Sequence, residues 1–120
     1  MPVAAVLVED SQTIRDNLIP ALAELADVEV VAIAETANEA VAVVEGLQDR
    51  WQLVVVDLFL REGTGLAVLR AFQDRLPHQR LAVLTNYPTE EMRRRSLALG
   101  ADAIFDKSKE LELFFAWCRS

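Results

Sequence analysis

Residues 53–57 read LVVVD, and residues 81–85 read LAVLT. Each stretch is an unbroken run of four apolar residues followed by one polar residue. Such short apolar runs are typical of strands covered on both faces, as in a parallel sheet. These two stretches therefore predict the centre of a parallel sheet, and each places a polar side chain where its strand ends.

Three further stretches have the same strand-like character, namely residues 4–9, 29–34 and 103–106. Between the five stretches, apolar residues recur at the three- and four-residue spacing of helices that bury one face. These stripes are Ile14, Leu18, Leu22 and Leu25; Ala40, Val43, Val44 and Leu47; Leu66, Leu69, Phe72 and Leu76; and Met92, Leu97 and Leu99. The alternation predicts an α/β fold with helices on both faces of the sheet and right-handed crossovers.

Several residues mark the expected ends of these helices. Thr36 and Glu39 match a capping box, in which each side chain accepts a hydrogen bond from a backbone N–H that lacks a helical partner. Thr89 is followed by two glutamates that suit the positive end of a helix, and Gly100 suits its other end. Pro20 conflicts with this pattern, because a proline inside a helix costs about 3 kcal/mol unless the helix kinks.

Polar residues end four of the five predicted strands: Glu9 and Asp10, Asp57, Thr85, and Lys107. A single residue of this kind is usually a solvated loop residue, but the joint pattern places all of them at one edge of the sheet. A flavodoxin-like strand order of 2-1-3-4-5 makes the first and third strands neighbours and joins the acids in one pocket. The alternative order 3-2-1-4-5 separates Asp57 from the other two acids. We therefore predict the first order.

This pocket carries three carboxylates, Glu9, Asp10 and Asp57, against one ammonium, Lys107. Packed carboxylates repel one another, so a divalent cation is expected to relieve the strain. Oxygen-only ligands favour Mg²⁺, although Ca²⁺ and Mn²⁺ remain alternatives. Asp10 and Asp57 are predicted to bind the metal directly, Glu9 through water, and the backbone carbonyl of Phe59 as a further ligand.

Composition limits the remaining possibilities. The chain has 120 residues and a formal net charge of -7, which opposes direct binding to nucleic acid. Its apolar runs are too short to span a membrane, and acids follow the first run too early for a secretion signal. Cys118 is the only cysteine, which suits the reducing cytoplasm. We expect a single cytoplasmic domain over residues 1–120, without contact to membrane.

The chain resembles the receiver domain of bacterial two-component response regulators, of the chemotaxis-regulator type, over essentially its whole length. The similar stretches are VLVEDSQTIRDNL, LVVVDLFLREGTGLAVL, LAVLTNYP and GADAIFDKS, at residues 6–18, 53–69, 81–88 and 100–108. The resemblance implies Mg²⁺-dependent phosphoryl transfer to Asp57 from a sensor histidine kinase or a phosphotransfer protein. It implies that Glu9 and Asp10 hold the metal, that Thr85 binds a phosphoryl oxygen, and that Lys107 pairs with the phosphoryl charge. Such a domain catalyses only its own modification and is not an enzyme with a separate substrate.

The sequence departs from the receiver pattern near this site. Ile104 stands where an aromatic residue is common, and the neighbouring Phe105 is expected on the opposite face of its strand. Asn86 follows Thr85, where a small residue is usual. Phe59 and Tyr87 are expected to screen the acyl phosphate from water and slow its hydrolysis, unless they only pack the loops.

The last helix suggests an output surface. One face, Leu111, Phe114, Phe115 and Cys118, is expected to pack against the sheet, and Leu113 and Trp117 lie opposite. With Arg93, Arg94 and Arg95 they are predicted to form a surface for a downstream protein or a second copy. The alternative is that the helix buries both sides and that the arginines are solvated.

Other functions fit less well. A phosphatase of the haloacid-dehalogenase type needs a second acid two residues after Asp57, where this chain has Phe59. A flavin-binding module needs a phosphate loop after the first strand, where EDSQT would repel phosphate. The main alternative is a degenerate receiver, which binds partners without phosphorylation. It fits Ile104 and Asn86, but the retained acids, threonine and lysine oppose it.

Overall fold

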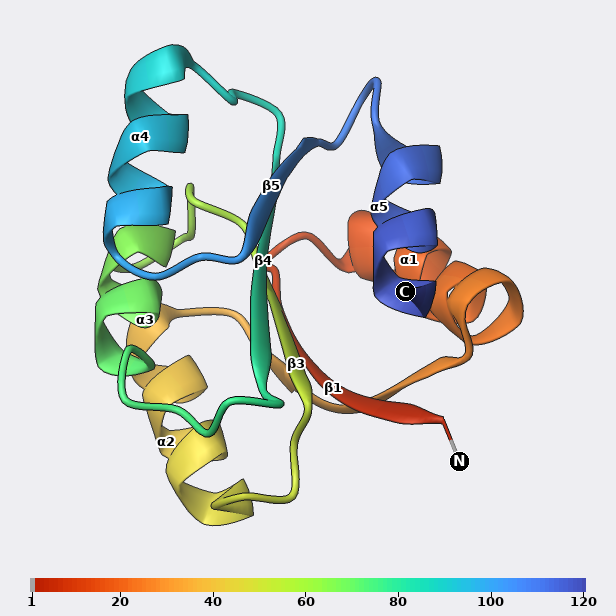
Figure 1. The fold of residues 1–120 in the computed structure, drawn as a ribbon, viewed down its shortest axis with the longest axis horizontal. Coiled ribbons are helices and arrows are strands. Elements are labelled where there is room, and N and C mark those ends of the chain that lie inside the picture. Colours follow the sequence, from red (N-terminus) through yellow and green to blue (C-terminus); the bar gives the residue numbers. More distant parts are fainter. Residues whose placement is uncertain (1) are drawn as a thin grey trace.

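The computed structural model describes residues 2–120, and in this range five strands alternate with five helices (Figure 1). The strands are β1 (Val3–Val8), β2 (Val28–Ala34), β3 (Leu53–Val56), β4 (Arg80–Thr85) and β5 (Ala103–Asp106). The helices are α1 (Gln12–Ala26), α2 (Ala37–Leu47), α3 (Gly65–Ala71), α4 (Glu90–Ala98) and α5 (Leu111–Arg119). All five predicted strands are present, and their bounds differ from the predicted ones by one residue at most.

The strands form one parallel sheet in the order β2-β1-β3-β4-β5. This confirms the predicted flavodoxin-like order and excludes the alternative. The central strand β3 is buried along its whole length, as its unbroken apolar sequence predicts. Because β1 pairs with β3, the residues that follow these two strands lie next to each other.

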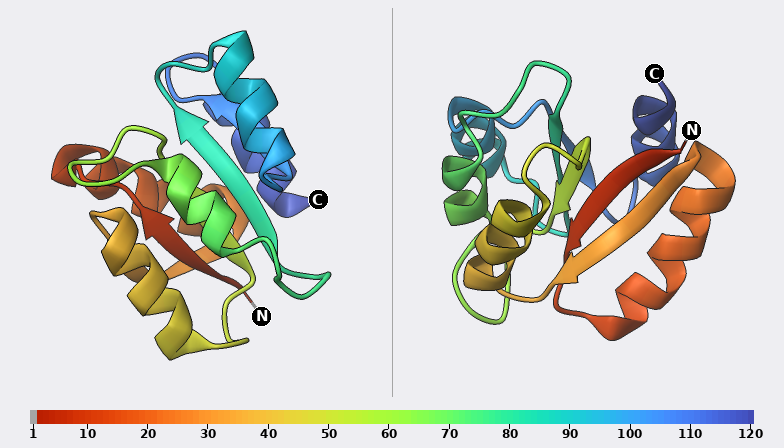
Figure 2. Two further views of the ribbon diagram at one scale, coloured as in Figure 1. Left: turned by 90° about the vertical axis from the view of Figure 1, so that its left-hand side faces the viewer. Right: turned by 90° about the horizontal axis from the view of Figure 1, so that it is seen from below.

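Two hydrophobic cores lie on opposite faces of the sheet (Figures 1 and 2). Helices α2, α3 and α4 cover one face, and α1 and α5 cover the other. Alternate residues of a strand point to opposite faces, so Val54 and Val56 pack on the first side while Leu53 and Val55 pack on the second. Ile104 and Phe105 likewise pack on opposite sides, which confirms the predicted divergence.

The helix ends follow most of the sequence signals. Thr36 caps α2 by accepting a hydrogen bond from the Glu39 N–H at 3.1 Å. The reciprocal part of the predicted capping box is wrong, because the Glu39 carboxylate accepts from the N–H of Glu35 instead of Thr36. Thr89 caps α4, and Gly100 follows this helix with a positive φ of 102° that favours glycine.

Helix α1 is assigned as one helix through Pro20, which is exposed. Proline removes one backbone hydrogen bond from a helix interior, which destabilises α1 locally. Burial of Leu18, Leu22 and Ala26 against the sheet stabilises the helix. In residues 2–120 the length and apolar content of every helix fall short of what crossing a membrane requires.

Candidate functional site

Three carboxylates meet at the carboxyl edge of the sheet. Val8 of β1 is paired with Val56 of β3, so Glu9 and Asp57 follow neighbouring strands side by side. One carboxylate oxygen from each of Glu9, Asp10 and Asp57 lies within 4.8 Å of the others. The predicted convergence of these residues is confirmed, and it follows directly from the strand order.

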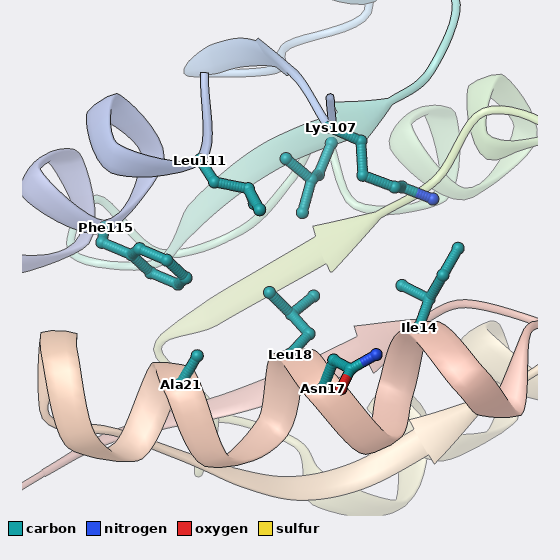
Figure 3. Close-up of a pocket in the computed structure, with 8 residues that line it drawn as sticks. Ile14, Asn17, Leu18, Ala21, Lys107, Leu111 and Phe115 are labelled. Carbon is teal, nitrogen blue, oxygen red and sulfur yellow. The ribbon is translucent and has the colours of Figure 1, made fainter. Parts of the chain in front are cut away.

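Lys107 joins two of these carboxylates. Its Nζ atom donates a hydrogen bond to Glu9 Oε1 at 2.5 Å and to Asp57 Oδ2 at 3.1 Å. Its stem lines an apolar groove between α1 and α5, and Figure 3 shows the ammonium pointing away from Phe115 at the far end of that groove. The lysine side chain is only 10% exposed, so the positive charge is held inside the carboxylate cluster.

Glu9 is the most buried acid of the cluster, with 3% of its surface exposed. This burial raises the pKa of Glu9, and the hydrogen bonds from Lys107 and from the Ser11 N–H offset that rise only in part. The negative charge of Asp57 raises this pKa further. A cation with more than one positive charge is therefore better suited to hold Glu9 ionised than Lys107 alone.

Thr85 ends β4 at the same edge and is fully buried. Its hydroxyl accepts a hydrogen bond from the Tyr87 N–H at 3.3 Å, and its backbone carbonyl accepts one from the Lys107 N–H at 2.9 Å. The backbone of β4 therefore ties the hydroxyl and the ammonium to one edge. Three clustered carboxylates that could hold a cation, a hydroxyl and an ammonium together suit the binding of a phosphoryl group.

The sequence profile of the response regulator receiver domain matches residues 5–116. This chain belongs to the response regulator receiver family. The resemblance found in the sequence is therefore confirmed, and the fold is that of a signalling domain.

Relatives in sequence are transcriptional regulators. This receiver domain is 31% identical over 108 residues to the DNA-binding transcriptional activator DevR/DosR of Mycobacterium tuberculosis. It is 32% identical over 107 residues to the uncharacterized transcriptional regulatory protein YhcZ of Bacillus subtilis. Each match covers 89% of this chain and 49% of the relative, so the chain spans about half the length of these proteins.

Solved structures show the same fold. A LuxR-family DNA-binding response regulator from Staphylococcus aureus superimposes with a TM-score of 0.85 at 16% identity, covering 98% of this chain and 99% of that one. The CheX–CheY–BeF3–Mg²⁺ complex from Borrelia burgdorferi gives a TM-score of 0.81 at 17% identity, covering 98% of this chain and 90% of that one. At these identities the likeness concerns the fold alone.

Arg15 is a site residue of this receiver domain that the sequence reasoning missed. Its Nη1 atom donates to the backbone carbonyl of Glu9 at 2.8 Å and pairs with the Glu35 carboxylate at 3.1 Å. It thereby ties the loop that carries Glu9 and Asp10 to the end of β2. The available signal was an arginine in the first turns of the helix that follows two acids.

Two aromatic rings stand on the loops that follow Asp57 and Thr85. Phe59 and Tyr87 form an edge-to-face pair with ring centroids 5.4 Å apart, and both rings are exposed. The Phe59 N–H also donates to Asp57 Oδ1 at 3.3 Å, which holds the start of this loop against the Asp57 carboxylate. The backbone carbonyl of Phe59 stays a predicted metal ligand.

The structure divides the predicted output surface of the receiver domain. Arg93 is engaged with the Glu110 carboxylate and with the backbone carbonyls of Pro88 and Ile104. Arg94 and Leu113 are exposed, and Arg95 lines a groove toward α3. Trp117 is half-buried against Phe105, and the Arg80 guanidinium lies over its ring. The three arginines diverge because successive residues of a helix point in different directions.

Proposed function

We propose that this chain is a phosphorylation-activated cytoplasmic receiver domain, formed by residues 1–120, and that Asp57 is its phosphoacceptor. A sensor histidine kinase or a phosphotransfer protein would supply the phosphoryl group as phosphohistidine. The observation that carries this proposal is the position of Asp57 between two further carboxylates and an ammonium, with Lys107 Nζ at 3.1 Å from its Oδ2 atom.

The donor set fits Mg²⁺. Asp10 and Asp57 are the proposed direct ligands, with Glu9 acting through water and the carbonyl of Phe59 completing the protein share. All are oxygen donors, and their three negative charges exceed the single charge of Lys107, which matches the preference of this ion. When bound, the ion would neutralise the oxygens of the phosphoryl group. The similar Borrelia burgdorferi complex contains Mg²⁺ together with BeF3, which supports this choice.

The proposed transfer is an in-line displacement at phosphorus. A carboxylate oxygen of Asp57 forms the new P–O bond while the P–N bond to the donor imidazole breaks, and the electron pair of that bond leaves with the imidazole. A carboxylate nucleophile needs no general base. Lys107 would pair with the charge of the transferred group. The Thr85 hydroxyl accepts a hydrogen bond from the Tyr87 N–H, and its own proton would be donated to a phosphoryl oxygen.

Switching in this chain would involve the loops that follow β4 and β5. The Ser108 hydroxyl donates to Asn86 Oδ1 at 3.1 Å, so a movement of Thr85 toward the phosphoryl group pulls on a contact between these loops. Ile104 packs in the core beside α4 and offers no aromatic ring to follow the threonine. The downstream partner would meet the surface of α4 and α5 that includes Arg94, Leu113 and the exposed edge of Trp117. For residues 1–120 we propose no direct contact with nucleic acid and no contact with membrane.

Intact-mass spectrometry after incubation with acetyl phosphate and Mg²⁺ tests the proposal. The wild type is expected to gain one phosphoryl group, and Asp57→Asn is expected to gain none. Asp49→Asn is the matched control, because Asp49 is an exposed aspartate in the loop before β3, at the opposite edge of the sheet. Absence of the adduct from the folded wild type would favour the degenerate receiver, which binds partners without phosphorylation.

A further inference from the structure

A groove of about 350 Å³ runs between α3 and α4, on the face of the sheet opposite α1 and α5. The two helices lie side by side in Figure 2. Apolar side chains form much of its lining, among them Phe59, Leu66, Ala67 and Met92. The charged residues that line it are two arginines, Arg70 and Arg95, and no carboxylate does so.

These two arginines differ from most others in the chain. Of the ten arginines in the sequence, seven form a salt bridge or donate a hydrogen bond to a carbonyl within residues 2–120. Arg70, Arg94 and Arg95 do neither within that range, and all three are exposed. Two of the three therefore line the same groove, in a chain whose 19 acids exceed its 12 basic residues.

The apolar side chains of the groove are also partly open to solvent. Phe59 is 52% exposed, and Leu66 and Met92 are half-buried. In α4 the buried residue is Ser96, so the helix contributes no fully buried apolar side chain of its own. Aromatic residues, methionine and arginine are the types enriched at protein interfaces, where arginine and aromatic residues often dominate the binding energy.

We propose that the groove between α3 and α4 binds an acidic segment of a partner protein. Its apolar side chains would enter beside Leu66 and Met92, and its carboxylates would meet the guanidinium groups of Arg70 and Arg95. Guanidinium groups bind carboxylates through paired hydrogen bonds, which favours this chemistry. A nucleic acid fits worse, because apolar side chains form much of the lining and the net charge of -7 repels a phosphate backbone.

This proposal does not require phosphorylation of Asp57, and it is tested on the unphosphorylated protein. Fluorescence anisotropy would follow a labelled synthetic peptide in which leucine and phenylalanine alternate with aspartate and glutamate. A second peptide carries lysine in place of every acid. The acidic peptide is expected to bind saturably, and the lysine peptide is expected not to bind.

Charge reversal locates the binding. Arg70→Glu and Arg95→Glu are each expected to lower the affinity for the acidic peptide about tenfold, because each variant loses a charge-assisted hydrogen bond. Lys109→Glu makes the same reversal of charge at an exposed residue outside the groove and is expected to leave the affinity nearly unchanged. Circular dichroism and thermal unfolding check that all three variants are folded.

Several outcomes would overturn the proposal. Equal weakening by Lys109→Glu would show attraction to the general charge of the domain instead of the groove. Saturable binding of the lysine peptide, or no binding of the acidic one, would remove the charge complementarity. A dimer in sedimentation velocity that Arg70→Glu dissociates would assign the groove to a second copy of the chain, and tight binding of a short DNA duplex would assign it to nucleic acid.

Discussion

Lys107 holds two carboxylates of the site together, and both partners are nearly buried. Lys107→Met leaves Glu9 and Asp57 without this cation, and breaking a buried charge pair typically costs about 3 kcal/mol. We expect a loss of this order in the free energy of unfolding, measured with urea in the absence of divalent cations. The exposed Lys109 is the matched control. An equal effect of Lys109→Met would show that the pairing contributes nothing to stability.

Cys118 is buried in the core between the sheet and helices α1 and α5. Its side chain is 2% exposed, and burial raises its pKa from 9.0 to about 11. Only the thiolate reacts with disulfide reagents, so at pH 8 the folded protein is expected to react at least about 100-fold more slowly than the unfolded chain. The raised pKa means that the folded state favours the neutral thiol. Burial of this thiol therefore contributes fully to the free energy of unfolding below pH 9, and the contribution is lost as the pH rises towards 11. Equal rates in buffer and in urea would contradict this.

Phe59 and Tyr87 lie beside the proposed acyl phosphate as an edge-to-face pair. If the rings screen it from water, Phe59→Ala and Tyr87→Ala should each speed hydrolysis several-fold, measured as loss of the mass adduct in Mg²⁺. Leu113→Ala removes an exposed apolar side chain on α5 and serves as control. A wild-type lifetime of only a few seconds would show that the rings pack the loops without protecting the phosphate.

The sequence predicts which residues form the site, but not how their side chains pair. Glu9, Asp10 and Asp57 could be predicted because neighbouring parallel strands must bring their ends together. The pairing of Lys107 with Glu9 could not, because the choice among three acids depends on where each side chain is buried. The role of Arg15 could not be predicted, because its bond to the Glu9 carbonyl involves no side-chain partner and its pairing with Glu35 depends on how the loops after β1 and β2 are placed.

At the scale of elements, α4 buries fewer residues than any other helix that the structure describes. Ser96 is its buried residue, and the hydroxyl of Ser96 has no hydrogen-bond partner among the described residues. An unsatisfied buried hydroxyl costs about 1–3 kcal/mol, and alanine also has the higher helix propensity. We expect Ser96→Ala to raise the free energy of unfolding by about 1–2 kcal/mol in urea denaturation.

The exposed Ala98 of the same helix supplies the control for this prediction. Ala98→Ser reports the propensity difference alone, which is about 0.5 kcal/mol. A gain for Ser96→Ala that does not exceed this value would mean that the hydroxyl has a partner in solution. A loss of stability would mean that it is an important one.

Element bounds followed from the sequence where one signal dominated, as in the apolar run of β3. The strand register and the backbone conformation at some helix ends did not follow from the sequence in this way. Between β1 and β2 the register passes from Ala5–Val30 to Val6–Ala32, so Val31 is an extra residue in the edge strand. Asp27 and Gln48 directly follow helices α1 and α2 and have positive φ values, although neither residue is glycine. Residue types alone do not mark such positions.

At the scale of the whole molecule, the strand order and the chemistry of the site depend on each other. The order was predictable because only β1 beside β3 joins the acids, and the helices then had to cover both faces. The orientation of the three arginines on α4 was not predictable in the same way. Arg93, Arg94 and Arg95 are consecutive in sequence, but one is internally paired, one is free at the surface, and one lines the groove toward α3.

Isothermal titration with Mg²⁺ tests most directly whether the carboxyl edge of the sheet is built around a shared cation. The wild type is expected to bind one ion per chain, and saturation at ten times the dissociation constant should stabilise the fold by about 1.4 kcal/mol. Asp10→Asn is expected to abolish or strongly weaken this binding, while Asp49→Asn leaves it intact. Binding that persists unchanged in both Asp10→Asn and Asp57→Asn, or no binding by the wild type, would contradict the account.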